Sequence, residues 1–555
     1  MKSTLTSSLF CAGLCLSGAV MAAEPPHPQT TAAIAAADLS ARVKAIADDS
    51  FQGRGPGTPA GERAAQWIAD EMKGIGLKPG NRGSYFQEVP AVSITLDPTK
   101  SSLSIAGPDG AKPFKFADDA MWWTPQYDRV DIALDRAPLV FAGYGVVAPE
   151  ENWNDYAGLD VKGKVVVVLI NDPGFLTHDD TLFKGRAMTY YGRWTYKFEE
   201  AARQGAAGVI IVHETEPAAY GWQVVRTSWT GAQSYLEAAD KNKGMVALRS
   251  WITHEAAQAL FRRAGLDYDS LKIAANRRGF KPIPMGGLTV SAVMHSTVAR
   301  TTTRNVVGVV TGSKHPDDYI LYTAHWDHLG VKPELPGPDK IFNGAQDNAM
   351  GVATILEIGE AFAKAQTPPE RSIAIVSWTL EEQGLLGSEY FAQHPIWPLS
   401  HIVAGVNRDG GLPEGPARDL VVIGSGASEL EGILVAALKQ QNRTVAPEPE
   451  PEKGGFYRSD HISLAKVGVP MLYPKDGFDL RGGGKTAGQA LRDDYLDHRY
   501  HQPSDEFDPN WDLSGLVEDT NVLFAFGRTL ANSEAWPNWY KGNEFRAIRD
   551  ASLAR

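Results

Sequence analysis

The stretch Tyr319-Ile320-Leu321-Tyr322-Thr323-Ala324-His325-Trp326-Asp327-His328 passes from apolar residues directly into polar ones. Its first half predicts a strand that is buried on both faces. Comparable runs occur at 306–310, 373–378, 402–406, 420–423 and 469–472, with helical patterns at 349–364 and 429–441. This alternation predicts an α/β fold whose mixed, mostly parallel sheet is sandwiched by helices.

A second set of strands is expected closer to the N-terminus. The β-branched runs at 165–170 and 209–212 are separated by a helix-like segment at 198–205. Continuous runs of this kind are typical of strands covered on both sides. An amphipathic helix is expected over 60–76, where apolar residues recur at helical spacing and glycines end the pattern.

Composition excludes several classes of protein. At about 150 residues per domain, 555 residues correspond to roughly three or four domains at most. A hydrophobic content of 43% excludes a disordered chain. The net charge of −12 and the absence of a Lys/Arg-rich run argue against a nucleic-acid partner.

The N-terminal residues predict a secretory signal peptide over 1–22. Lys2 precedes a short apolar run that ends in small residues, and the run is too short to cross a bilayer. A buried N-terminal helix is the alternative. Cys11 and Cys15 both lie within the signal, so the exported chain would lack disulfides and thiol sites. We expect a periplasmic or secreted protein with no membrane span.

Histidine and carboxylate residues follow the ends of the predicted strands, which is where open α/β sheets place their active sites. His325 comes first, and taken alone it favours a hydrogen-bonded structural histidine over a metal ligand. Asp327 follows, two residues on, and its carboxylate can hold the other ring nitrogen of a metal-binding imidazole. Asp347 precedes an apolar helix and by itself is as well explained as a helix N-cap.

Two adjacent carboxylates, Glu381 and Glu382, leave the strand at 373–378. They would repel each other unless a cation lies between them or one is protonated; two solvated glutamates in a first helical turn are the alternative. Asp409 follows another strand, and His501 lies in a loop. Two imidazoles and three carboxylates, with one spare glutamate, suit two zinc ions that share a water, although cobalt or manganese would accept the same ligands.

These motifs, in this order, resemble the co-catalytic di-zinc exopeptidases, a family that includes secreted bacterial aminopeptidases and glutamate carboxypeptidase. The matching segments are His-x-Asp at 325–327, Gly-Ala-x-Asp-Asn at 344–348, Glu-Glu-x-Gly-Leu-Leu-Gly-Ser at 381–388, Asn-x-Asp at 407–409 and Tyr-His-x-Pro-x-Asp at 500–505. Further matches at 51–58 and 85–87 extend the resemblance over nearly the whole mature chain. The resemblance implies a zinc exopeptidase fold.

The resemblance also implies a set of two Zn²⁺ ions. His325 and Asp409 would bind one ion, Glu382 and His501 the other, and Asp347 would bridge them. A cis peptide is expected after Asp347.

Three further residues receive roles from the same resemblance. Glu381 would act as the general base, and Tyr500 would donate a hydrogen bond to the oxyanion unless it only packs in the core. Asp327 would orient His325 through its other ring nitrogen without binding the metal.

The segment 131–285 resembles the protease-associated domain that many members of the family carry as an insertion. We expect no catalytic residue in it. The peptidase domain would then consist of 23–130 and 286–555. Arg458 lies where relatives form the wall of the substrate pocket, and either a substrate contact or a structural salt bridge would explain it.

The leading functional hypothesis is a zinc aminopeptidase that removes N-terminal residues from a peptide substrate. A carboxypeptidase or a one-zinc glutaminyl cyclase on the same scaffold is the first alternative. A non-catalytic, receptor-like binding protein is the second, and the complete ligand set argues against it. The sequence fixes neither the side-chain preference nor the oligomeric state.

Overall fold

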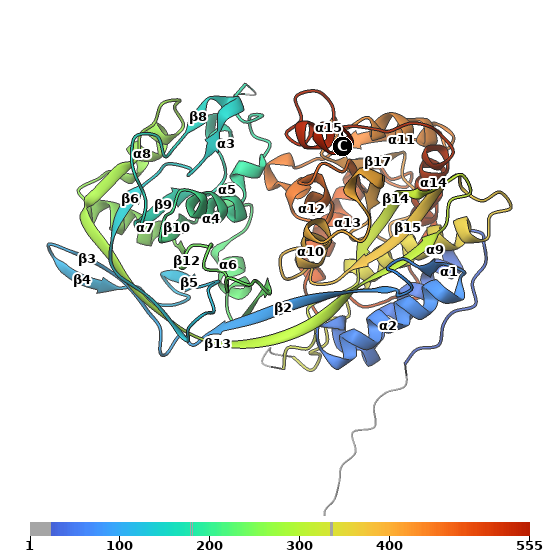
Figure 1. Ribbon diagram of the computed structural model, residues 1–555, viewed down its shortest axis with the longest axis horizontal. Coiled ribbons are helices and arrows are strands. Elements are labelled where there is room, and N and C mark those ends of the chain that lie inside the picture. Colours follow the sequence, from blue (N-terminus) through green and yellow to red (C-terminus); the bar gives the residue numbers. More distant parts are fainter. Residues whose placement is uncertain (1–23, 178, 180, 334–336, 555) are drawn as a thin grey trace, which may run out of the picture.

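The computed structural model describes residues 24–177, 179, 181–333 and 337–554, which form two lobes side by side (Figure 1). The expected signal peptide lies outside the described residues. Strand β13 (Ile283–Val310) runs along the base of both lobes. It pairs with β6 (Asp131–Phe141) in the smaller lobe and with β2 (Phe86–Leu96) and β15 (Arg371–Trp378) in the larger one.

The larger lobe contains the predicted mixed sheet, so the fold class is confirmed. The middle pairs are parallel and link β15 to β14, β14 to β16, and β16 to β19. β17 is antiparallel to β19 and parallel to β18. The bounds are β14 (His315–His325), β16 (Ile402–Asn407), β17 (Asp419–Ile423), β18 (Thr444–Pro447) and β19 (Met471–Lys475).

Helices cover both faces of this sheet. Ile320 and Tyr322 point into a core formed with five helices, whereas Leu321 points into a second core on the opposite face. This alternation explains why the strand is apolar at every position. The first face is covered by α1 (Ala36–Ile46), α2 (Pro59–Gly74), α9 (Met350–Ala363), α11 (Leu430–Lys439) and α14 (Ser514–Ala531). The second is covered by α10 (Leu386–Gln393) and α12 (His461–Ala465).

The smaller lobe has its own sheet and its own cores. Its strands run in the order β6, β9 (Val165–Leu169), β10 (Gly208–Val212), β12 (Leu248–Ile252), β5 (Ala120–Trp123). α4 (Trp194–Arg203) packs on one face, and α7 (His254–Arg263) and α8 (Tyr268–Ala275) pack on the other. β5 and β3 (Ser102–Gly107) lie upstream of residue 131, where we expected the inserted domain to begin, yet they belong to this lobe.

No helix in the described part of the chain is both long and apolar enough to cross a bilayer. Buried ion pairs join some of the helices of the larger lobe. The best example is Arg42 of α1, whose side chain is 0% exposed. Its guanidinium lies 3.0 Å from Glu71 of α2 and 2.6 and 2.5 Å from Glu357 and Glu360 of α9.

Replacing Arg42 by Met should destabilise the larger lobe by about 3–5 kcal/mol, because three buried carboxylates would lose their cation. The measurement is the shift of the urea unfolding midpoint. Arg300→Met is the matched control, since Arg300 is 57% exposed and pairs with Glu237 on the surface, where an ion pair contributes about 1 kcal/mol or less. Equal shifts for the two variants would contradict the role of Arg42.

Candidate metal centre

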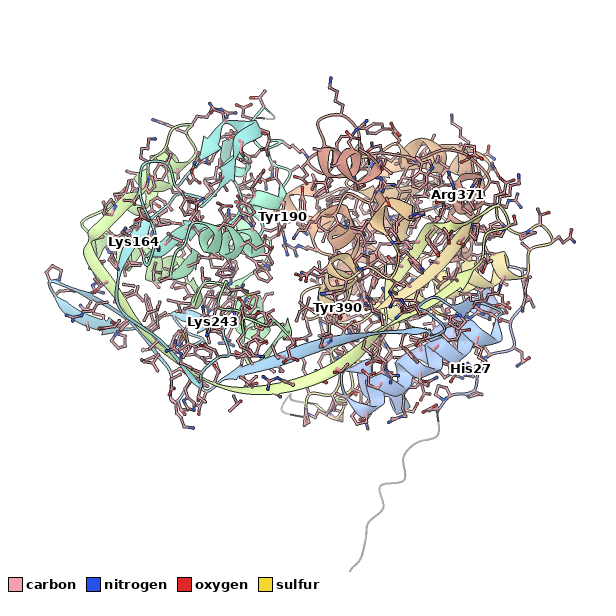
Figure 2. All side chains as sticks on the ribbon, viewed as in Figure 1. His27, Lys164, Tyr190, Lys243, Arg371 and Tyr390 are labelled. Atoms are coloured by element: carbon pink, nitrogen blue, oxygen red, sulfur yellow. The ribbon has the colours of Figure 1, made fainter. Side chains whose placement is uncertain are left out.

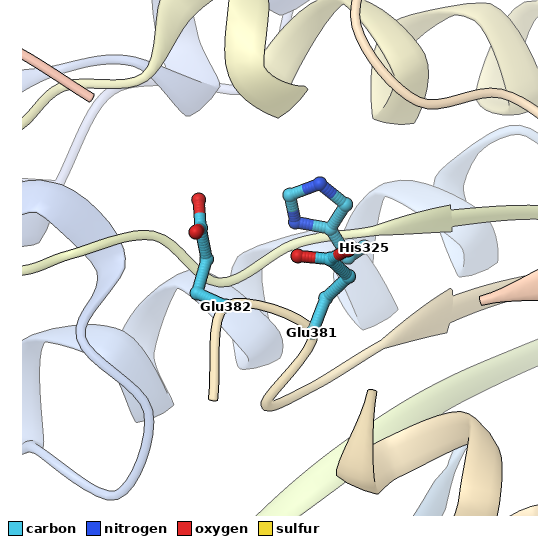
Figure 3. A group of neighbouring side chains, drawn as sticks. All are labelled: His325, Glu381 and Glu382. Atoms are coloured by element: carbon cyan, nitrogen blue, oxygen red, sulfur yellow. The ribbon is translucent and has the colours of Figure 1, made fainter. Parts of the chain in front are cut away.

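Three neighbouring parallel strands deliver their polar residues to the same edge of the large sheet. His325 is the last residue of β14, and Asp409 follows β16 by two residues. Glu381 and Glu382 leave the turn that follows β15 and lie beside His325 (Figure 3). These three residues offer ligand atoms that all lie within 4.8 Å of one another. The carboxyl edge of the sheet therefore gathers side chains that are up to 84 positions apart in sequence.

Two loops complete the cluster with Asp347 and His501. The carboxylate of Asp505 accepts hydrogen bonds from the backbone N–H groups of Gln346 and Asp347, both at 3.0 Å, which fixes the first loop against the second. The peptide bond after Asp347 is cis, as expected. Asn348 Oδ1 accepts from the N–H of residue 351 in the first turn of α9, so the helix is capped while Asp347 remains free to face the site.

The distances between these ligand atoms are those of a metal coordination shell. His325 Nε2 lies 3.2 Å from Asp347 Oδ1 and 3.6 Å from Asp409 Oδ1. His501 Nε2 lies 3.3 Å from Asp347 Oδ2 and 3.1 Å from Glu382 Oε2. Two atoms bound to one zinc at about 2.0–2.1 Å and at tetrahedral angles are roughly 3.3 Å apart. The five residues thus fall into two groups, His325 with Asp409 and His501 with Glu382, and each group contacts one oxygen of Asp347.

The charge of the cluster also favours a cation. Burial opposes protonation of His325, but Glu381 and the neighbouring aspartates outweigh it and hold the pKa of His325 well above its ordinary value. Burial likewise lowers the pKa of His501, yet Glu382 and Asp347 raise it to about 10. Both imidazoles are therefore surrounded by excess negative charge. A divalent cation would replace the two protons and balance the carboxylates.

Asp327 occupies a different role from the expected one. Its carboxylate is 3.9 Å from His325 Nδ1, beyond hydrogen-bonding distance, and the backbone carbonyl of Asp327 lies at 3.1 Å instead. The carboxylate accepts from the N–H groups of Glu381 and Glu382 at 3.1 and 3.4 Å. It therefore orients the two-glutamate turn, while its main chain orients the histidine. This distinction cannot be read from the spacing of His325 and Asp327.

His328 is a neighbour of the centre that sequence reasoning left without a role. Its Nδ1 lies 2.5 Å from Glu382 Oε1, a hydrogen-bond distance that is too short for two ligands of one metal. The contact holds one oxygen of Glu382, so the other is left facing His501. His328 belongs to the quoted motif, but its partner is 54 positions away, so only the folded chain reveals the pair.

Tyr473 and Tyr500 each contact a residue of the cluster. Tyr473 donates its hydroxyl hydrogen to Asp409 Oδ2 at 3.1 Å, a contact that the sequence did not suggest. The ring of Tyr500 stacks on His501 with centroids 3.9 Å apart, and this residue is 43% exposed. Tyr500 is therefore beside the centre and open to solvent, as a residue that contacts substrate must be.

Comparison with known proteins agrees with this geometry. Residues 305–525, which include all five candidate ligands, match peptidase family M28, and residues 136–245 match the PA domain. The chain carries a peptidase family M28 domain. Since α1 and α2 precede the PA match and pack in the larger lobe, the PA domain is an insertion in the M28 domain.

Relatives of the M28 domain are similar over part of their length. Aminopeptidase NAALADL1 of Mus musculus is 33% identical over 139 residues, 24% of this chain and 17% of its own. A probable zinc metalloprotease of Phaeosphaeria nodorum is 30% identical over 167 residues, 28% of this chain and 30% of its own. The matches thus span less than a third of either relative. An aminopeptidase structure from Aneurinibacillus sp. strain AM-1 shares the fold, with a TM-score of 0.51, 18% identity and coverage of 91% and 95% of the two chains.

His461 is a buried titratable group in the wall of the M28 domain. Its ring lies 4.8 Å from that of Phe456 and 4.4 Å from that of Tyr473, and among the described residues neither nitrogen has a hydrogen-bond partner. Burial lowers the pKa of His461 to about 3. Because the unfolded chain binds this proton with a pKa of about 6.5, the stability contributed by neutral His461 is complete above pH 6.5 and is lost as the pH falls toward 3.

Between pH 7.5 and 5, metal-free wild type should therefore lose about 2 kcal/mol more stability than His461→Phe, which keeps an aromatic ring in the slot. Urea unfolding at the two pH values, in the presence of a chelator, measures the difference. His498→Phe removes a 71% exposed histidine and should behave like wild type. Parallel pH profiles for wild type and His461→Phe would refute the buried neutral imidazole.

Proposed function

We propose that this chain is an exported di-zinc aminopeptidase that removes N-terminal residues from peptides. The observation that carries the proposal is the separation of 3.1–3.6 Å between the ligand atoms of the two groups. Two imidazoles with carboxylate oxygens form a donor set that suits zinc. His325 and Asp409 would hold one ion, Glu382 and His501 the other, and Asp347 both.

Zinc ions in this centre would supply Lewis acidity, which polarises a peptide carbonyl and lowers the pKa of water. The protein supplies the proton transfer. The carboxylate of Glu381 would accept a proton from the attacking water and pass it to the leaving amine. Burial and the charges of Asp409 and Glu382 raise the pKa of Glu381 well above its ordinary value, which favours a carboxyl group able to keep a proton between the two transfers.

Positioning of Glu381 depends on the main chain. Its backbone N–H donates to the carboxylate of Asp327. The side chain of the next residue, Glu382, is held by a hydrogen bond with His328. The glutamate turn is thus fixed at both ends, so that Glu381 need not move between its two roles. Tyr500 would donate its hydroxyl hydrogen to the oxyanion that develops from the carbonyl oxygen.

Export is a separate part of the proposal and rests on the residues at 1–22. A lysine, an apolar run and small residues form the pattern of a cleaved secretory signal. The protein would act in the periplasm or the medium.

Changing Glu381 to Ala should reduce kcat at least about a hundredfold, because the general base is lost, while zinc remains bound. Activity and zinc content, measured by atomic emission on the same purified sample, check both halves of this expectation. Glu534→Ala, at a glutamate that is 83% exposed, serves as the control and should keep full activity. Near-normal turnover by Glu381→Ala would sink the assignment of the base.

The direction of cleavage is tested with three peptides of one sequence, of which one has both termini free, one is N-acetylated and one is C-terminally amidated. An aminopeptidase cleaves the free and amidated peptides and leaves the acetylated one intact. Cleavage of the acetylated peptide, while the amidated one stays intact, would establish a carboxypeptidase. Cyclisation of an N-terminal glutamine, with one zinc bound per chain, would establish a cyclase. A chain that binds no metal and turns over no peptide would be a binding protein.

A further inference from the structure

The segment 51–54 lies directly against two loops of the candidate metal centre. It forms the end of η1 (Asp49–Arg54), a short helix between α1 and α2. Figure 2 marks the outer side of this helix pair with the label of His27, whose ring stacks on that of Trp67 in α2 at 4.8 Å. His27 is 42% exposed, whereas Arg54 is 1% exposed. The last residue of η1 is therefore directed into the interior of the larger lobe.

The backbone of η1 is shaped to fit between these loops. Gln52, Gly53 and Arg54 have φ angles of 47°, 67° and 50°, in the left-handed region that residues with a side chain rarely adopt. A Cβ atom at Gly53 would lie 2.5 Å from the carbonyl oxygen of Gly330 and 2.6 Å from that of Phe342. The carbonyl of Gly53 accepts from the N–H of Gly330 at 3.0 Å. Backbone strain of this kind is typical of functional sites, where the surrounding structure maintains it.

All three nitrogens of the Arg54 guanidinium donate to main-chain carbonyl groups. Nε donates to Trp326 at 2.7 Å, and Nη2 donates to Gly344 at 2.9 Å. Nη1 donates to Ile46 at 3.1 Å and also to Asn343. With the side chains of the described residues, Arg54 forms no ion pair. It is therefore a buried cation whose donors all hold backbone.

The acceptors lie on the two segments that carry neighbouring metal ligands. One acceptor directly follows His325, and two others lie three and four residues before Asp347. Among the described residues, no backbone hydrogen bond joins 325–328 directly to 343–349. Arg54 provides this connection next to the point where His325 Nε2 and Asp347 Oδ1 lie 3.2 Å apart.

A guanidinium group suits this connection better than any other side chain. Its donors form a rigid planar fork, whereas lysine carries all of its donors on one atom. Hydrogen bonds from an ionised donor are also roughly twice as strong as those from a neutral one. Burial lowers the pKa of Arg54 only to about 10, so the side chain is charged at neutral pH.

We propose that Arg54 is a positioning residue of the metal centre, and that its guanidinium sets the distance between His325 and the bridging Asp347. It acts through the backbone of the two segments. Asp505 accepts from N–H groups at the other end of the Asp347 loop, so this loop is held at both ends. The inference rests on the zinc centre of the proposed function and is independent of the direction of cleavage.

The first test is zinc affinity, measured on the purified protein by competition with a chromophoric chelator. Arg54→Gln and Arg54→Lys should each bind zinc about tenfold to a hundredfold more weakly than wild type, because the groups that orient metal ligands typically contribute this much. If Arg54→Gln does not fold, Arg54→Lys carries the test, since it keeps the charge and most of the side chain. Wild-type affinity in both variants would overturn the proposal, and wild-type affinity in Arg54→Lys alone would overturn the role of the planar fork.

Arg549 supplies a matched control at the opposite end of the sheet. It is 0% exposed, and its Nη2 donates to the carbonyl groups of Ile402 and Val403 at 2.9 and 3.0 Å. These acceptors lie at the start of β16, whereas Asp409 follows its end. Arg549→Gln should lower the thermal midpoint, as should Arg54→Gln, but it should leave zinc affinity unchanged. An equal loss of zinc affinity in both variants would mean that lost stability explains the effect, and would overturn the proposal.

Kinetics and spectra distinguish positioning from a purely structural role. At saturating zinc, and per folded chain, Arg54→Lys should lower kcat about tenfold or more. KM for Leu-Gly-Gly should change less than about threefold, because the groups that bind substrate are retained. The visible absorption spectrum of the cobalt-loaded variant should also differ from that of cobalt-loaded wild type. An unchanged spectrum together with an unchanged kcat would overturn the positioning role.

Zinc binding by wild type separates this inference from the proposed function. If wild type binds zinc but hydrolyses no peptide, the proposed function fails, while weaker zinc binding by Arg54→Gln still supports the role of Arg54. If wild type hydrolyses peptides and Arg54→Gln matches its zinc affinity and kcat, the proposed function stands and the role of Arg54 is overturned.

Discussion

Buried negative charge at one edge of the parallel sheet governs how the surrounding loops are arranged. Asp347, Glu382 and Asp409 converge there, and they are in contact with the imidazoles of His325, His328 and His501. Ionised carboxylates are costly to bury unless cations pair with them, so a bound metal ion would stabilise the cluster. Asp327, His328 and the Asp505 loop then act as a frame that prevents the carboxylates from moving apart.

Much of this could be predicted because it is local in sequence. The segment 320–325 is almost entirely apolar and ends in a histidine. This pattern predicts that the strand is buried and that the histidine lies at the carboxyl edge of the sheet. Contacts between distant segments could not be predicted. The hydrogen bond of His328 with Glu382, and the role of the Asp327 carboxylate in holding the two-glutamate turn, depend on how the loops pack.

The extent of the smaller lobe shows the same limit. β13 is one continuous strand of 28 residues that belongs to the sheets of both lobes. The sequence therefore has no turn or linker there that would mark the boundary between the lobes. β3 and β5 join the smaller lobe through pairing with β13 and β12, which lie more than a hundred residues away. In this arrangement the larger lobe supplies the candidate metal ligands, and β13 joins the smaller lobe to it.

Two metal ions that share Asp347 would each be visible by anomalous scattering. The decisive measurement is X-ray diffraction from zinc-loaded crystals, collected on both sides of the zinc absorption edge. We expect two anomalous peaks, one between His325 and Asp409 and one between Glu382 and His501, with Asp347 in contact with both. A single peak, or a peak bound to His328 in place of His501, would contradict it.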